Sequence, residues 1–149
     1  FVLDGILLFL EKINDPIIKE FNDKTQGKRK RAIARASISK GTGVVRINGK
    51  LMNQMPQDMN LLKIQEPILL AGAVAQKVDI NVRVHGGGVN GQADAVRLAI
   101  ARGLVQQDES LKDKFTQYDR LLLVADVRRK EVCKPNDSKA RAKRQKSYR

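Results

Sequence analysis

The part of the sequence best suited to chemistry is a glycine loop, Gly86-Gly87-Gly88-Val89-Asn90-Gly91, which has the spacing G-x-G-x-x-G. Alternating apolar and polar residues predict a strand directly before this loop, and an apolar stripe predicts a helix directly after it. A dinucleotide-binding fingerprint requires this context, because its glycines let a pyrophosphate approach the backbone at the start of a helix. We therefore expect the loop to favour an anion.

Other requirements of a dinucleotide-binding enzyme are not met around this loop. About twenty positions further on, such a site needs an acidic residue at the end of a strand, whereas the chain has Gln106-Gln107-Asp108-Glu109 at an expected helix end. We expect the following stretch to be too short for the second half of a doubly wound sheet, and no catalytic constellation accompanies the loop. An RNA phosphate satisfies the same chemistry. The alternatives are a small nucleotide-binding enzyme and a tight turn that binds nothing.

Two clusters of basic residues offer a second kind of chemistry. One is Lys28 to Arg31 with Arg35, and the other lies between Val127 and Arg149. The second stretch has ten basic and two acidic residues, and therefore carries +8 of the formal net charge of +13. With so little to bury, we expect it to be disordered alone and to fold only against a polyanion. A solubilising face or a localisation signal is the alternative, but two separate clusters suit a protein wedged into folded RNA.

The overall composition supports a nucleic-acid partner. Lysine and arginine number 29 against 16 aspartates and glutamates, and this excess destabilises a compact domain unless an anionic partner offsets it. The charge does not follow a long apolar span or a basic amphipathic helix, which argues against a membrane surface. Aromatic residues make up 4% of the chain and tryptophan is absent, so we expect contact with phosphates and shape, not stacking on bases.

Single residues exclude further classes of site. The apolar stretch Phe1 to Leu10 lacks the basic leader and cleavage site of a secretory signal, so we expect a cytoplasmic location. The lone Cys133 cannot form an internal disulfide. His85 is the one histidine of the sequence, so these two residues are too few for a zinc site, and we expect no other metal and no cofactor. His85 is expected to form a hydrogen bond at an RNA surface or to be an ordinary loop residue.

Periodicity predicts the elements that position these residues. Apolar residues at helical spacing predict an amphipathic helix from Gly5 to Phe21. Alternation predicts strands over residues 32–39 and 44–47, which we expect to pair as a hairpin whose polar face carries Arg35 and Arg46. A helix over residues 61–70 is expected to bend or restart at Pro67.

The second half of the chain has the clearest patterns. Strict alternation predicts a strand over residues 78–84, and apolar stripes predict helices over residues 92–107 and 111–118. The hydrophobic pattern stops after Asp126. We therefore expect an N-terminal amphipathic extension (1–26), a globular RNA-binding domain (27–126) and an extended basic C-terminal tail (127–149).

Short motifs in a fixed order resemble the family of small-subunit ribosomal protein nine, of the archaeal and eukaryotic type. The resemblance runs from about Gly27 to Arg149. It includes Gly27-Lys28-Arg29-Lys30, Ala32-Ile33-Ala34, Ile47-Asn48-Gly49, Glu66-Pro67, Leu69-Leu70, Val78-Asp79-Ile80, Gly86-Gly87-Gly88, Gly91-Gln92-Ala93, Ala99-Ile100-Ala101-Arg102, Tyr118-Asp119-Arg120, Arg128-Arg129 and Gln145-Lys146-Ser147-Tyr148-Arg149.

The resemblance implies an α+β fold, a ribosomal-protein-type β-α-β sandwich with a left-handed crossover and an extended basic C-terminal tail. It also implies a structural, non-enzymatic constituent of the small ribosomal subunit that binds rRNA in the subunit head beside neighbouring head proteins. The end of the tail would approach the transfer RNA in the P site during translation.

Together, the clusters and the resemblance predict two sets of site residues. The rRNA-binding set is Lys28, Arg29, Lys30, Arg31, Arg35, His85, Gly86, Gly87, Gly88, Gln92, Arg128, Arg129, Lys139, Arg141, Lys143 and Arg144. The residues expected near transfer RNA are Lys146, Ser147, Tyr148 and Arg149.

Overall fold

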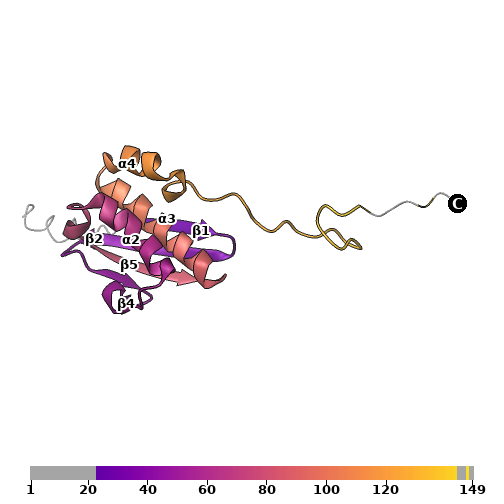
Figure 1. Ribbon diagram of the computed structural model, residues 1–149, viewed down its shortest axis with the longest axis horizontal. Helices are drawn as coiled ribbons and strands as arrows, with labels where there is room; N and C mark the ends of the chain where they lie inside the picture. The colour runs from indigo at the N-terminus through magenta and orange to yellow at the C-terminus, as the bar shows by residue number, and fades with distance from the viewer. Residues whose placement is uncertain (1–22, 144–146, 148–149) are drawn as a thin grey trace, which may run out of the picture.

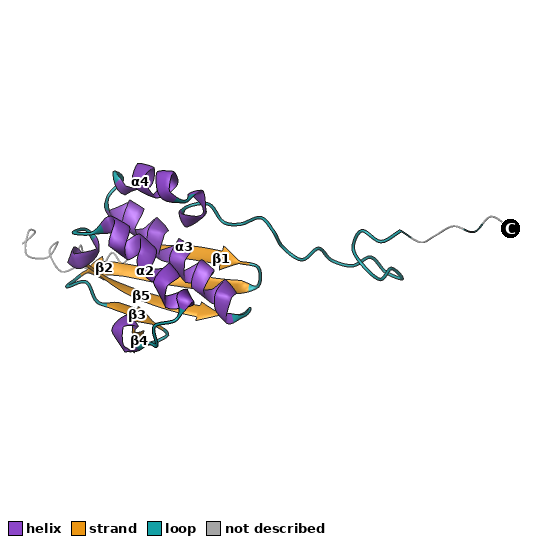
Figure 2. Ribbon diagram, viewed as in Figure 1, coloured by secondary structure: helices purple, strands orange, loops and turns teal. Residues whose placement is uncertain are grey.

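The computed structural model describes residues 23–143 and residue 147. A five-stranded mixed sheet forms one layer, and the helices α2 (Met59–Ala71) and α3 (Val89–Gln107) cover one of its faces (Figures 1 and 2). This two-layer arrangement confirms the expected α+β class. The helix expected from Gly5 to Phe21 lies outside the described residues.

The sheet has the strand order β1-β2-β5-β3-β4. Strands β1 (Asp23–Arg29) and β2 (Ala32–Lys40) are antiparallel and are joined by the two residues Lys30 and Arg31. Strand β2 also pairs antiparallel with β5 (Val78–His85), the strand that alternation predicted. On the other side of β5 lie β3 (Val45–Ile47), which is parallel to it, and the short β4 (Lys50–Leu51).

The prediction that residues 32–39 and 44–47 pair as a hairpin is wrong, because β5 lies between β2 and β3. The connection that looked like a hairpin turn instead passes the end of β5. The Gly41 amide donates to the Lys77 carbonyl, and the carboxylate of Asp79 accepts from the amides of Thr42 and Val44. These bonds direct the chain past β5 to its far side, so the true hairpin partner of β2 is β1.

The β1 strand carried no clear signal because its core-facing side chains are small. Thr25 is buried and its hydroxyl donates to the Ala99 carbonyl of α3 at 2.8 Å. A Cβ atom at Gly27 would lie 2.0 Å from the Ala95 carbonyl oxygen, so only glycine permits this approach. The helix α3 therefore lies directly on the backbone of β1.

The parallel pair β3 and β5 is connected through α2, which gives the β-α-β unit that the resemblance implies. The Asn48 side chain donates a hydrogen bond to the Val84 carbonyl and accepts one from the Val84 amide. These bonds hold the end of β3, where the crossover begins, against β5. Helix α2 runs through Pro67 without a restart, contrary to one of the expected outcomes. The proline ring is buried on the core side of the helix.

The core lies between the sheet and α3. This helix buries residues on most of its circumference, since it contacts β1 and β2 on one side and α2 on another. The expected helix over residues 111–118 is α4 (Leu111–Tyr118), whose Phe115 is fully buried. Among the described residues, no helix combines the length and apolar character needed to cross a bilayer.

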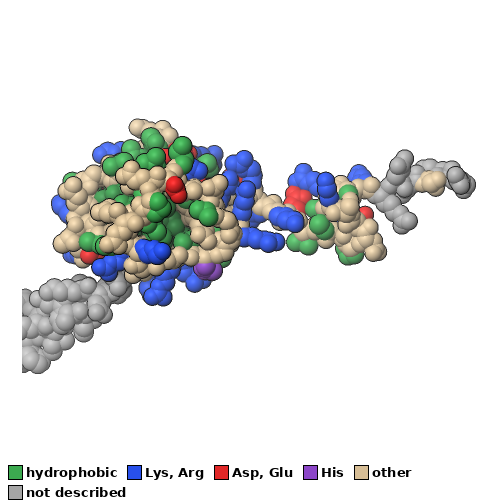
Figure 3. Space-filling model, turned by 60° about the horizontal axis from the view of Figure 1, so that its bottom comes forward, with side chains coloured by type: hydrophobic (Ala, Val, Ile, Leu, Met, Phe, Trp, Pro, Cys, Tyr) green, Lys and Arg blue, Asp and Glu red, His purple; other side chains and the backbone are tan. Residues whose placement is uncertain are grey.

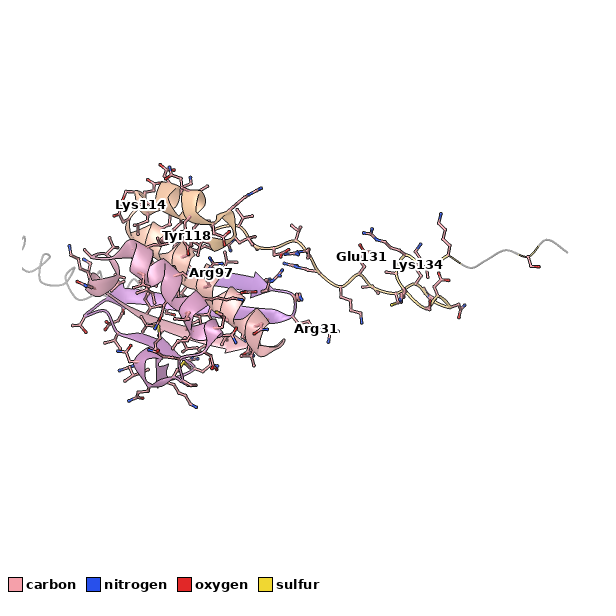
Figure 4. The ribbon with its side chains drawn as sticks, viewed as in Figure 1. Arg31, Arg97, Lys114, Tyr118, Glu131 and Lys134 are labelled. Carbon is pink, nitrogen blue, oxygen red and sulfur yellow. The ribbon has the colours of Figure 1, made fainter. Side chains whose placement is uncertain are left out.

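Three short 3₁₀ helices complete the domain. They are η1 (Met52–Gln54), η2 (Ala75–Lys77) and η3 (Arg120–Leu122). The Arg97 side chain of α3 joins two layers of helix, because it lies 2.5 Å from a Glu66 oxygen of α2 and 3.0 Å from an Asp119 oxygen before η3 (Figure 4). From residue 127 onwards the described tail has neither helix nor strand and extends away from the domain (Figure 1).

The contact between β1 and α3 predicts the effect of Gly27→Ala. The added methyl group would meet helix backbone and not a movable side chain, so we expect a loss of about 1 to 3 kcal/mol in the free energy of unfolding. Urea unfolding of the full chain measures it. Gly91→Ala is the matched control, because its nearest neighbouring atoms would lie 3.7 Å away, and alanine is favoured over glycine within a helix. An unchanged midpoint for Gly27→Ala would contradict the packing described.

Candidate nucleic-acid interface

Three segments that are far apart in the sequence line one cleft of about 1340 Å³, which we call the basic cleft. They are the β1–β2 turn, the glycine loop with the first turn of α3, and the start of the tail. The residues of the cleft are Arg29, Lys30, Arg31, Gly87, Gly88, Val89, Asn90, Gly91, Asp94, Arg128, Arg129, Lys130, Glu131, Val132 and Cys133. Lysine and arginine side chains gather where the tail leaves the domain (Figure 3).

The glycines of the loop permit close contact with the β1–β2 turn. Gly86 and Gly87 have φ angles of 75° and 68°, a left-handed conformation that other residues adopt at a cost. A Cβ atom at Gly86 would lie 2.7 Å from the Arg31 carbonyl oxygen, and one at Gly87 would lie 3.0 Å from the Ala32 amide nitrogen. The loop therefore holds Arg31 at the mouth of the cleft, where Figure 4 shows it at the tip of the hairpin.

The start of α3 adds a polarised end of helix to the same cleft. Gly88 occupies the N-cap position with no side-chain cap, and a Cβ atom there would meet nothing within 4 Å. The Gln92 side chain donates to the Gly86 carbonyl at 3.1 Å and so braces the loop from inside the helix. The free amides of the first turn of α3 carry partial positive charge, which favours an anion at this point.

A carboxylate at the edge of the cleft anchors the start of the tail. Asp126 pairs with Arg29 of β1, and it accepts hydrogen bonds from the amide and the guanidinium of Arg128. Its side chain is 9% exposed. The hydrogen bonds from Arg128 hold the pKa of the Asp126 carboxyl well below its usual range, with a further contribution from the charge of Arg29. Asp126 therefore stays ionised and ties the tail to β1.

Ion pairing divides the basic residues of the cleft into two groups. Arg29 contacts Asp94 as well as Asp126, so its charge is neutralised within the protein. Within residues 23–143, no ion pair involves the remaining cations of the cleft apart from Arg128. These remaining cations are Lys30, Arg31, Arg129 and Lys130. They are the groups that this arrangement leaves available for phosphate.

The structure separates the other predicted site residues from the cleft. Arg35 and His85 lie in a different hollow, on the face of the sheet that the helices do not cover. Lys28 belongs to the same side, since it alternates along β1 with the buried Gly27. The rRNA-binding set thus covers two surfaces. The sequence did not predict three residues in or beside the cleft, namely Asp126, Asp94 and Lys130. Only the position of Asp126, two residues before Arg128, could have indicated the anchor of the tail.

The outer tail residues lie beyond the domain. Lys139, Arg141, Lys143 and Ser147 are exposed, and Figure 4 shows Glu131 and Lys134 on the same extended segment. Arg141 lies 2.5 Å from Glu131, which lowers the pKa of the Glu131 carboxyl. Arg144, Lys146, Tyr148 and Arg149 lie outside the described residues.

The topology also bears on the dinucleotide alternative. Such a fingerprint lies within a βαβ unit whose second strand is parallel to the first. Among the described residues no strand follows α3, which leads instead to α4 and the tail. The glycine loop therefore has the local geometry of an anion site without the sheet of a Rossmann domain.

Comparison with known proteins gives a single family. A family model described as ribosomal protein S9/S16 matches residues 27–149. The small ribosomal subunit protein uS9 of Thermoplasma volcanium is 53% identical over 127 residues, which cover 84% of this chain and 96% of that protein. The protein of the same name from Pyrobaculum aerophilum is 52% identical over 125 residues, covering 83% of this chain and 88% of the relative.

The anchor at Asp126 predicts a titration. Because its folded-state pKa is lowered, the anchor stabilises the folded state at pH values above the ordinary pKa of 3.8 and is lost as pH falls through the lowered value. In NMR spectra of the full chain, the Arg128 amide resonance should therefore titrate with a midpoint below 3.8. Asp126→Asn is the control that should abolish this titration. A midpoint at or above the ordinary value would contradict the anchor.

Proposed function

The chain belongs to the ribosomal protein S9/S16 family, and from this premise we propose that it is a structural constituent of the small ribosomal subunit. It binds rRNA in the subunit head, beside neighbouring head proteins, in the cytoplasm. Its role is to hold RNA in place, not to catalyse a reaction. The relatives from Thermoplasma volcanium and Pyrobaculum aerophilum carry the name of a small-subunit protein.

The basic cleft is the observation that carries the rRNA-binding proposal. Its available cations, including Lys30 and Arg31, come from separate segments of the chain, so they surround a ligand and do not form one flat stripe. Lysine and arginine that neutralise phosphates release counterions, which drives association. The N-terminal amides of α3 add hydrogen-bond donors of the kind that phosphate oxygens accept. A folded RNA whose backbone enters the cleft satisfies both.

The tail extends the same function outward. Its described residues from 127 onwards have no regular structure, and its cations Lys139 and Lys143 are exposed. We propose that this stretch, with Arg141 and Arg144, lies along rRNA. Its end, Lys146 to Arg149, approaches the transfer RNA in the P site. The division of labour follows from reach, because a chain anchored at Asp126 and extended by about 3.3 Å per residue spans several tens of ångströms.

This proposal also divides the chain into parts. They are the N-terminal extension (1–26), the globular domain (27–126) and the basic tail (127–149). Strand β1 crosses the first boundary because it begins at Asp23, and the anchor at Asp126 lies at the second. Each part can then be tested separately.

The first test of the proposal neutralises cations of the cleft. Lys30→Gln with Arg31→Gln should weaken binding to a transcript of the small-subunit rRNA, and should reduce the slope of log K against log salt. The expected reduction is about 0.7 to 0.9 for each phosphate that the protein no longer neutralises. Filter binding at several salt concentrations measures both quantities.

The matched control removes the same charge elsewhere. Lys112 and Lys114 are exposed on α4, away from the cleft, and Figure 4 shows Lys114 at the far side of the domain. Lys112→Gln with Lys114→Gln should change the affinity and the slope much less. Equal losses for the two double variants would mean that net charge alone drives binding, and the cleft would not be the site.

The second test removes the end of the tail. Deletion of residues 146–149 should leave incorporation into the small subunit intact, because the domain and the cleft remain. It should weaken binding of transfer RNA to the P site of the assembled subunits. Sedimentation of reconstituted subunits checks assembly, and filter binding of aminoacylated transfer RNA checks the second outcome. An unchanged affinity for transfer RNA in subunits that contain the truncated protein would contradict the proposed role of the end of the tail.

A further inference from the structure

The face of the sheet opposite α2 and α3 is covered by no described element. Side chains alternate along each strand, so the residues next to buried core positions point to this side. We call it the open sheet face. Its principal residues are Lys24, Gln26, Lys28, Arg35, Ser37, Arg46, Asn81, Arg83 and His85. A hollow of about 620 Å³ lies over its centre.

The strand register brings like charges together at the centre of this face. Arg35 of β2 is directly opposite Arg83 of β5, and Gln26 is its partner on the other side. Side chains directly opposite in an antiparallel pair have Cβ atoms about 4.5 to 5.5 Å apart, and like charges at such positions are destabilising. The pair therefore costs the isolated domain stability.

No described acidic residue compensates for these charges. The ion pairs found among residues 23–143 involve none of Lys24, Lys28, Arg35, Arg46 and Arg83. The acid at the edge of the face is Asp79, whose carboxylate accepts from the Thr42 and Val44 amides. These bonds lower the pKa of Asp79, with a smaller contribution from the charge of Arg46. Asp79 is occupied in holding the loop, so the described part of the chain supplies no anion to the central arginines.

The arrangement of the face points to a ligand made of phosphates. One row runs across four strands through Lys24, Ser37, Asn81 and Arg46, in register. With strands about 4.8 Å apart, its two cations are separated by roughly 14 Å. The residues between them are hydrogen-bond donors. None of the principal residues of the face is Phe, Tyr or Trp, and His85, at the end of β5, is the one ring among them, so the face offers bases no row of rings to stack on. A sugar-phosphate backbone lying across the strands meets donors at each step.

We propose that the open sheet face is a second RNA-binding surface, which holds the phosphate backbone through Arg35 and Arg83 independently of the basic cleft. The two surfaces meet at the β1–β2 hairpin, because Lys28 belongs to the face and Lys30 and Arg31 to the cleft. The hairpin is thus held between RNA segments on two sides. This inference rests on the proposed function and identifies a further contact area for it.

The arginine pair gives a test in which RNA binding should weaken without a loss of stability. In the full chain, Arg35→Gln with Arg83→Gln should raise the midpoint of thermal unfolding at low salt or leave it unchanged, because repulsion is removed. The same double variant should bind the small-subunit rRNA of Thermoplasma volcanium, the source of a relative 53% identical to this chain, several-fold more weakly. Its salt slope should fall by about 0.7 to 0.9 for each phosphate that is no longer neutralised.

The control variants separate this inference from the proposed function. The Lys30 and Arg31 double variant could lose affinity while the Arg35 and Arg83 double variant binds as the wild type does. In that case the inference about the open sheet face is wrong, and the proposed function stands. If both bind normally, both proposals fail. A drop in the unfolding midpoint of the Arg35 and Arg83 variant would also overturn the inference, because the pair would then be structural.

Directed cleavage provides a measurement that does not depend on removing an arginine. In a Cys133→Ser background, Asn81→Cys places one thiol on the open face for an iron chelate that cuts nearby RNA. Gln117→Cys on α4 is the control, since Gln117 is exposed on the helical side. We expect specific cuts in the rRNA from position 81 and few from position 117. If the complex forms normally and position 81 gives no cuts, the open sheet face contacts no RNA and the inference is wrong. That result is expected if an acidic protein covers the face instead.

Discussion

Contact between backbones, without intervening side chains, determines where the charged groups of this protein lie. Gly27 brings β1 against α3, and Gly86 and Gly87 bring the glycine loop against the β1–β2 turn. A Cβ atom at Gly27 or Gly86 would lie less than 3 Å from a backbone atom of the neighbouring segment. Because the segments touch directly, the cations of the turn lie beside the positive end of α3. A larger separation would leave two unconnected basic patches.

The basic residues perform two tasks, and pairing distinguishes them. Arg97 joins α2, α3 and the segment before η3 through two carboxylates, and Arg29 joins β1 to α3 and to the tail through two others. Arg102 donates to the carbonyls of Gln26 and Leu123 and connects the same layers. These arginines position the elements. Cations outside the described ion pairs, such as Lys30 and Arg83, add to the repulsion within the free protein, and a polyanion relieves that repulsion.

Periodicity alone was enough to predict β5, α3 and α4. β5 and α4 bury apolar residues at regular spacing, and the apolar stripe that predicted α3 lies within the wider buried surface of that helix. It failed for β1, whose core-facing residues are Thr25 and Gly27, and consequently β2 was assigned the wrong hairpin partner. The basic turn and the glycine loop were recognised as separate features, but their meeting in one cleft depends on sheet order. Likewise, Arg35 was expected to bind RNA, whereas its neighbour Arg83 emerges only from the strand register. Pairing between distant strands leaves no local trace in a sequence.

The composition of β2 bears on why no described element forms a third layer over the open sheet face. On its core side β2 has Ala32, Ala34 and Ala36, which are small enough for α3 to pack closely. One helical layer therefore buries the core side of the sheet almost fully. Apart from Ile33, the opposite side of the sheet carries mainly polar and basic residues, so a further helix would gain little hydrophobic free energy by covering it. A phosphate backbone can cover that side, because it supplies the charge that the arginines lack and accepts hydrogen bonds from the donors between them.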